Sequence, residues 1–160
     1  VHGDRSRQPR RAEGYGVLFA AVDDASRLGF ARLYPDETAA SARAFLRALA
    51  SFYAAHGIAV ERILTDNGSC FRRRWAEACE RRGIRAKRTR PYRPQTNGEV
   101  ERFLRTLLGE WAYVRSYAHE DERQAALASY LESSNRRRPH RALGGQTPLQ
   151  RVNNLSGTNT

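Results

Sequence analysis

Residues 89–108 read Thr-Arg-Pro-Tyr-Arg-Pro-Gln-Thr-Asn-Gly-Glu-Val-Glu-Arg-Phe-Leu-Arg-Thr-Leu-Leu. The two prolines exclude regular structure from the first part of this stretch, because proline fixes its own φ and has no N–H to donate. Asn97 can cap a helix, and apolar residues recur at helical spacing from Val100 onward. We therefore predict a basic loop that leads into a helix from Asn97 to about Arg115. Glu101 would lie in its first turn, beside the buried stripe and facing a cleft.

A second stretch, Ile63-Leu64-Thr65-Asp66-Asn67-Gly68, offers a partner for that glutamate. An apolar run that begins at Ile58 predicts a short strand, and Asp66 then lies at its carboxyl end, followed by a turn. An aspartate before Asn-Gly can be a turn former and nothing more, so this residue alone leaves two roles open. Together with Glu101 it supplies the hard oxygen ligands that magnesium prefers.

Several short motifs carry a resemblance to a known family. They are Thr65-Asp66-Asn67-Gly68, Pro94-Gln95-Thr96-Asn97-Gly98, Glu101-Arg102, and a C-terminal pattern of His140, Ala142-Leu143-Gly144-Gly145 and Thr147-Pro148. Together they resemble the catalytic core of the integrase and transposase superfamily that has an Asp-Asp-Glu triad, and bacterial insertion-sequence transposases most of all. The resemblance implies an α/β, ribonuclease-H-like (retroviral-integrase-like) fold, in which helices flank a mixed sheet. It also implies DNA transposition or integration, by phosphodiester hydrolysis and strand transfer with Mg²⁺ or Mn²⁺.

The resemblance implies catalytic and metal-binding roles for two residues, Asp66 from the strand end and Glu101 from the helix. Glu99 is the rival glutamate, but it lies on another side of the helix, where we expect it to be solvated or to compensate the helix dipole. His140 has no second histidine at ligand spacing. We expect it to pack or to form hydrogen bonds.

The third carboxylate of the triad has no clear counterpart in this sequence. In the family it lies on a first strand that precedes a hairpin, and residues 15–33 resemble that hairpin, so Asp23 and Asp24 fall in its turn. Asp4 has no apolar strand around it. We expect the first strand and its aspartate to precede Val1. With two carboxylates, the site should bind magnesium weakly, and strand transfer should be lost while the fold persists.

The formal net charge of +11 indicates a polyanionic partner. A solvated, arginine-rich surface is the alternative for any single arginine, but the cluster from Arg81 to Arg93 favours DNA phosphates. Tyr92 could offer its ring to a displaced base or anchor the core, and capping alone would explain Asn97. The predicted DNA contacts are Lys87, Arg88, Arg90, Tyr92, Arg93, Gln95, Asn97, Arg102 and Arg105.

The remaining sequence divides into an arm, one domain and a tail. Residues 1–13 are polar and basic and predict a flexible arm, residues 14–152 an integrase catalytic core-like domain, and residues 153–160 a disordered tail. The expected elements are strands at 15–22, 28–34 and 84–87 and helices at 37–55, 71–82 and 120–135, the first capped by Asp36. We expect Cys79 in the core and Cys70 to be incidental.

No apolar run is long enough to span a bilayer, so we expect a soluble, cytoplasmic protein that is nucleoid-associated when bound to DNA. The expected partners are transposon ends and target DNA, together with further copies of the chain in a homodimer or higher oligomer. Two other functions stay open. One is a nuclease of the same fold that cuts without joining, and the other is a non-catalytic, basic DNA-binding relic.

Overall fold

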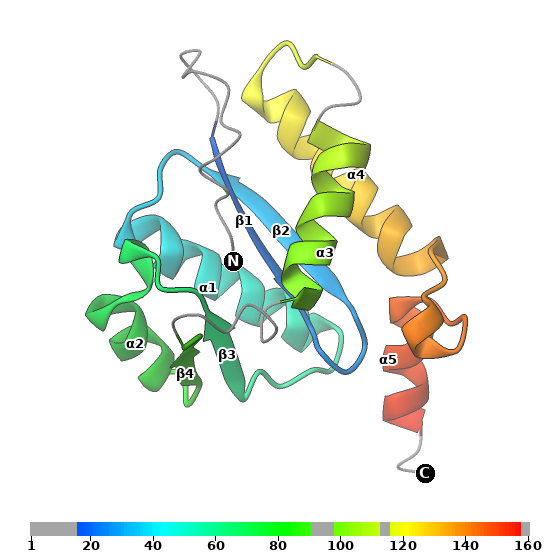
Figure 1. Ribbon diagram of the computed structural model, residues 1–160, viewed down its shortest axis with the longest axis horizontal. Helices are drawn as coiled ribbons and strands as arrows, with labels where there is room; N and C mark the ends of the chain where they lie inside the picture. Colours follow the sequence, from blue (N-terminus) through cyan, green and yellow to red (C-terminus); the bar gives the residue numbers. More distant parts are fainter. Residues whose placement is uncertain (1–15, 91–97, 113–115, 158–160) are drawn as a thin grey trace.

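The computed structural model describes residues 16–90, 98–112 and 116–157. Figure 1 shows strands and helices that alternate in the first half of this chain and helices alone in the second. The elements are β1 (Val17–Val22), β2 (Gly29–Tyr34), α1 (Ala39–Ala55), β3 (Arg62–Thr65), the 3₁₀ turn η2 (Ser69–Phe71), α2 (Arg73–Glu80), β4 (Arg85–Arg88), α3 (Gly98–Leu107), the π-helical turn η4 (Leu108–Ala112), α4 (Glu120–Arg137), the 3₁₀ turn η5 (Arg141–Leu143) and α5 (Pro148–Gly157). No helix in these ranges combines the length and apolar character that crossing a membrane requires.

The hairpin of β1 and β2 is antiparallel, with Val17 opposite Tyr34 and Val22 opposite Gly29. Its turn is closed by Asp23, whose Oδ2 accepts hydrogen bonds from the backbone N–H of Ser26 at 2.9 Å and from its hydroxyl at 2.6 Å. The described part of the hairpin and the turn-forming role of its aspartate therefore follow the sequence-based prediction.

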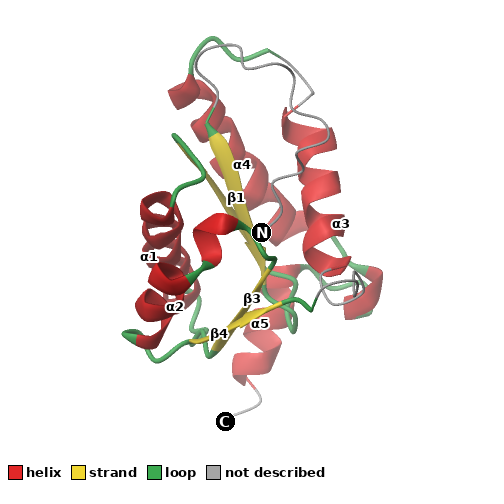
Figure 2. Ribbon diagram, turned by 60° about the vertical axis from the view of Figure 1, so that its left-hand side comes forward, coloured by secondary structure: helices red, strands yellow, loops and turns green. Residues whose placement is uncertain are grey.

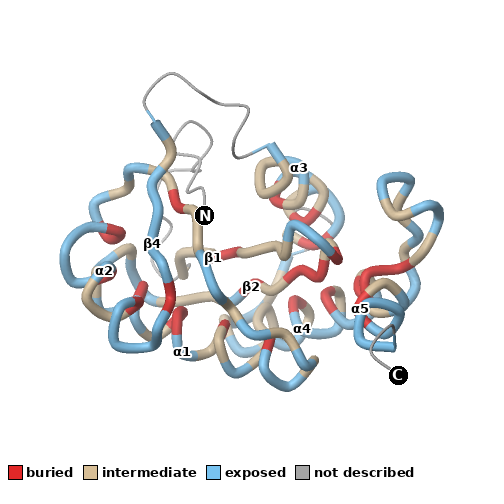
Figure 3. Tube along the Cα trace, turned by 90° about the horizontal axis from the view of Figure 1, so that it is seen from below, coloured by how far each residue is buried: buried red, intermediate tan, exposed pale blue. Residues whose placement is uncertain are grey.

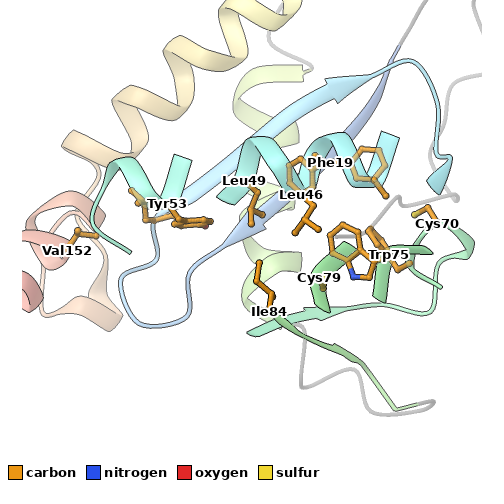
Figure 4. Close-up of a cluster of buried hydrophobic side chains, with 13 residues drawn as sticks. Phe19, Leu46, Leu49, Tyr53, Cys70, Trp75, Cys79, Ile84 and Val152 are labelled. Carbon is orange, nitrogen blue, oxygen red and sulfur yellow. The ribbon is translucent and has the colours of Figure 1, made fainter. Parts of the chain in front are cut away.

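Both faces of this hairpin are buried. Successive side chains of a strand point to opposite sides, and each side packs into a core of its own. One face contributes Phe19 and Leu28 to a core with α1, α2 and the β3–β4 region, shown in Figure 4. The other face contributes Ala20 and Ala31 to a second core with α3, η4 and α4. Figure 2 shows the resulting layers, with α1 and α2 on one side of β1 and with α3 and α4 on the other.

The sheet departs from the expected arrangement in one respect. β3 and β4 pair in parallel, from Arg62 opposite Arg85 to Thr65 opposite Arg88. Both senses of pairing are thus present, as a mixed sheet requires, but no ladder of hydrogen bonds joins the two pairs within the described ranges. The described strands therefore form two two-stranded sheets, where the sequence predicted one.

The start of α1 also differs from the prediction. The helix is capped by Thr38, whose Oγ1 accepts from the Ser41 N–H at 3.3 Å, and not by Asp36. Asp36 supports this cap from outside, since its Oδ1 accepts from the Ser41 hydroxyl at 2.6 Å and the Thr38 hydroxyl at 2.7 Å. These hydrogen bonds lower the pKa of Asp36, Ser41 contributing most. Sequence alone could not rank two good capping residues that lie two positions apart.

Two further expectations need correction. Cys70 is as buried as Cys79, because η2 turns it into the first core, and burial raises the pKa of both thiols to about 11. It is therefore a core residue, in the 3₁₀ turn that precedes α2. The tail predicted to fray after Val152 is helical through Gly157, with Val152 packed in the first core.

Asn135 of α4 joins that helix to the hairpin. Its side chain is buried, its Oδ1 accepts from the backbone N–H of Gly29 at 3.0 Å, and its Nδ2 donates to the Gly29 carbonyl at 2.9 Å. One amide thus satisfies both backbone groups at the start of β2.

We predict that Asn135→Ala destabilises the protein by about 2–4 kcal/mol, because it leaves a buried N–H and a buried C=O without partners. Denaturant unfolding measures the loss. The matched control is Asn153→Ala on the exposed side of α5, which should change stability by less than about 0.5 kcal/mol. Equal effects of the two substitutions would contradict this role of Asn135.

Candidate active site

Asp66 directly follows the last residue of β3, as the sequence predicted. Its side chain is half-buried, and its Oδ1 accepts a hydrogen bond from the Gly68 N–H at 2.8 Å. A Cβ at Gly68 would lie only 2.9 Å from that oxygen, so the close turn favours glycine. The turn-forming role is therefore present. It does not exclude metal binding, because a carboxylate has two oxygens that together accept up to about four interactions.

The exposed basic strand β4 ends beside Asp66. The parallel register sets Thr65 opposite Arg88, and Thr89 continues the ladder by donating its N–H to the Thr65 carbonyl at 2.9 Å. Asn67 then donates from Nδ2 to the Thr89 carbonyl at 3.2 Å. Figure 3 shows β4 exposed along its length. The structure thus brings Asp66 together with three predicted DNA contacts, Lys87, Arg88 and Arg90, all of them exposed.

Glu101 lies in the first turn of α3 and is half-buried. Beside it, the helix packs into the second core through Leu104 and Leu107. The ring of Phe103 covers Gly29 so closely that a Cβ at this glycine would lie 2.5 Å from its Cε2. The rotation of α3 about its axis, and with it the direction of Glu101, is therefore fixed by contact with the hairpin.

Glu99 lies in the first turn of α3, where the expected compensation of the helix dipole applies, and it also forms an ion pair that the sequence did not predict. Its Oε1 lies 3.4 Å from Nη2 of Arg27, in the hairpin turn, and 3.7 Å from Nη1 of Arg102. Arg27 adopts a left-handed φ of 62° and also pairs with Asp24 at 3.0 Å. Glu99 thus links α3 to the turn of the hairpin by an ion pair. Sequence reasoning missed this link because nothing in the local pattern relates two such distant residues.

Arg102 and Arg105 lie on the solvent side of α3, the first with 73% of its side chain exposed. Both are accessible to a polyanion. The other predicted DNA contacts, Tyr92, Arg93, Gln95 and Asn97, lie outside the described residues, as do the proline loop and the expected cap of α3.

His140 is half-buried, and its pKa is lowered by burial and by the positive charges of Arg138 and Arg27. Its backbone forms a tight turn, donating to the Gln146 carbonyl at 2.9 Å and accepting from the Gly145 N–H at 2.9 Å. Both effects favour the neutral form of the imidazole. This agrees with the expected packing role.

Asp66 and Glu101 offer the carboxylate oxygens that a hard cation such as Mg²⁺ prefers, but two carboxylates are few for one ion. Within residues 16–90, 98–112 and 116–157, no group of three or more acidic, histidine or cysteine side chains could hold a metal ion. Two groups are assembled instead, one of Asp66 with the β4 cations and one of Glu101 with the α3 arginines. The segment that joins them, residues 91–97, is not described.

The fold is ribonuclease-H-like. The catalytic core domain of BIV integrase superposes on this chain with a TM-score of 0.70 and 29% sequence identity, covering 92% of this chain and 93% of that one. Two sequence models of the integrase core domain match, one over residues 8–94 and the other over residues 82–148. The first match begins inside the segment predicted to be a basic arm.

The chain belongs to the integrase core domain family. The Gag-Pol polyprotein of bovine immunodeficiency virus is 33% identical over 135 residues, which are 84% of this chain and 8% of the polyprotein. The transposase InsD of insertion element IS2D from Escherichia coli strain K12 is 36% identical over 90 residues, which are 54% of this chain and 29% of the transposase. The chain spans less than half the length of these relatives. The family comprises polynucleotidyl transferases of the Asp-Asp-Glu type that depend in general on divalent metal.

Gly29→Ala should displace Phe103 and with it the first turn of α3, at a cost of about 1–3 kcal/mol in stability. The control is Gly109→Ala in η4, where an added Cβ meets nothing within 4 Å. Denaturant unfolding and a comparison of amide NMR shifts in α3 measure both effects. If Gly29→Ala left the α3 shifts unchanged, the hairpin would not set the direction of Glu101.

Proposed function

We propose that this chain provides the catalytic core of a transposase or integrase that cuts and joins DNA, acting on transposon ends and a target. The observation that carries the proposal is the position of Asp66. It follows the carboxyl end of β3, beside the exposed basic end of β4, in a chain of the integrase core domain family. Carboxylates at strand ends with basic side chains around them suit phosphodiester chemistry, because this chemistry needs metal ions and also side chains that bind phosphate groups.

Asp66 and Glu101 are the proposed ligands of Mg²⁺ or Mn²⁺, which when bound would neutralise charge on the reacting phosphate and oxygens. Their oxygens suit such ions, but the described residues do not complete a cage. Two carboxylates by themselves would hold such an ion weakly, because Mg²⁺ and Mn²⁺ take about six oxygen ligands. The residues of the chain have three proposed roles. The turn after β3 holds Asp66, the hairpin contacts hold α3 and thus Glu101, and the basic residues hold DNA.

The proposed DNA-binding surface consists of basic side chains on two elements. Lys87, Arg88 and Arg90 extend along and beyond β4, and Arg102 and Arg105 project from α3. Guanidinium groups bind phosphate oxygens in pairs, which holds a backbone without reading its sequence. Tyr92, Arg93, Gln95 and Asn97, in the loop between these two elements, are proposed to complete this surface. Further copies of the chain are proposed to join the active complex, a homodimer or higher oligomer, on DNA in the cytoplasm.

Two substitutions test the metal site. Asp66→Asn and Glu101→Gln should each weaken Mn²⁺ binding by about tenfold or more, since even the outer partners of metal ligands contribute that much. Electron paramagnetic resonance of free Mn²⁺ measures this binding. Glu132→Gln is the matched control, because it removes an equal charge from an exposed position of α4 that takes no part in the site, and it should leave the affinity within about twofold. If Glu101→Gln and Glu132→Gln behaved alike, Glu101 would not be a ligand.

The other two functions are separated by an assay with labelled terminal-repeat DNA. A nuclease would cut this DNA without joining it to a second molecule, and a DNA-binding relic would bind it without metal-dependent cutting. Robust Mg²⁺-dependent nicking that Glu101→Gln abolishes would show that two carboxylates suffice, against the expectation drawn from the sequence.

A further inference from the structure

A cavity of about 580 Å³ lies between α2 and the carboxyl ends of β3 and β4. Its wall includes Asn67, the residue after Asp66, and Arg88 at the end of β4. From the other side, η2 and α2 contribute Phe71, Arg72, Arg73 and Trp75. The cavity therefore opens next to the candidate active site, on the side away from α3.

The polar side chains of this wall are mainly hydrogen-bond donors. Among the described residues that line the cavity, three carry guanidinium groups and none carries a carboxylate. Neither Arg72 nor Arg88 forms an ion pair with another described residue. Arg73 pairs with Glu77 at 2.8 Å, but 91% of its side chain is exposed, and such surface pairs contribute at most about 1 kcal/mol. The wall thus favours an anion that carries several acceptor oxygens.

Trp75 also contributes to the wall of the cavity. The residue is 2% exposed, and its ring packs edge-on against Phe71 with 4.9 Å between the ring centroids. Its fluorescence can therefore report an anion that binds at this wall.

We propose that this cavity binds a backbone phosphate of a DNA strand whose neighbouring phosphodiester lies at Asp66. The inference rests on the proposed function and adds Arg72, Arg73 and Asn67 to the DNA-binding surface. A phosphodiester matches the wall because its non-bridging oxygens accept hydrogen bonds, carry its negative charge and donate nothing. The strand would leave the active site between α2 and β4, held by guanidinium groups on both sides.

A polymer fits this site better than a free anion does. β4 supplies Ala86 and Arg88 to the cavity, and Lys87 and Arg90 are exposed next to Arg88 along the chain, so one DNA strand can contact the cavity and these cations at once. Linked contacts of this kind strengthen binding without any contact being strong by itself. A strand held at the cavity would also be held at the carboxylate next to it.

The test compares two neighbouring arginines, Arg72 at the N-cap of α2 and Arg74 in its first turn. Arg72 lines the cavity, while Arg74 is exposed and does not line it. For duplex and single-stranded oligonucleotides, Arg72→Gln should lower the slope of log K against log salt by about 0.7–0.9, one phosphate contact, and Arg74→Gln should leave it unchanged. DNA should also change tryptophan fluorescence in the wild type and in Arg74→Gln, and much less in Arg72→Gln and Trp75→Phe.

Identical slopes for Arg72→Gln and Arg74→Gln would overturn the cavity site. If Lys87→Gln and Arg90→Gln still weakened DNA binding in that case, the proposed function would stand and only this inference would fail. If the wild type bound no DNA, the proposed function itself would fail. Polyglutamate is the second ligand to test, because binding of it with the same dependence on Arg72 would show a site for any polyanion and contradict phosphate recognition.

Discussion

The antiparallel pairing of β1 with β2 is the interaction on which the rest of the structure depends. Both faces of the hairpin are buried, so it separates and also joins the two hydrophobic cores. One face supports α1, α2 and the β3–β4 pair that ends at Asp66. The other supports α3, which carries Glu101. The two candidate ligands thus come from opposite sides of one hairpin, and a change in its twist or register would move one relative to the other.

The contacts that fix α3 on the hairpin show how packing prepares chemistry. Phe103 against Gly29 sets the rotation of the helix, and Glu99 with Arg27 attaches its first turn to the hairpin turn. Asn135 secures Gly29 from the far side by two backbone hydrogen bonds. Each contact is local and ordinary, but together they hold a carboxylate in place before substrate arrives. Such preorganisation is what metal-dependent catalysis needs from its protein scaffold.

Much of this arrangement was predictable from the sequence, and the remainder had identifiable causes. Hydrophobic spacing located the described strands and the α-helices α1 to α4, though not α5, and the Asp-Asn-Gly turn located Asp66. The prediction of the α1 cap was wrong because Thr38 and Asp36 are both good caps and lie close together in the sequence. Two other features depend on contacts between residues that are distant in the sequence. The burial of Cys70 follows from how η2 packs on α1, and the Glu99–Arg27 pair from how α3 lies on the hairpin, and neither leaves a pattern in the sequence.

Paramagnetic NMR with Mn²⁺ tests the central claim most directly, because bound Mn²⁺ broadens amide signals close to it. If Asp66 and Glu101 share one cation, low concentrations of Mn²⁺ should broaden residues 66–68 and 99–103 together, and Asp66→Asn should abolish the broadening of both segments. Persistent broadening at residues 99–103 in Asp66→Asn, at the same Mn²⁺ concentration, would show that the two carboxylates do not form a common site.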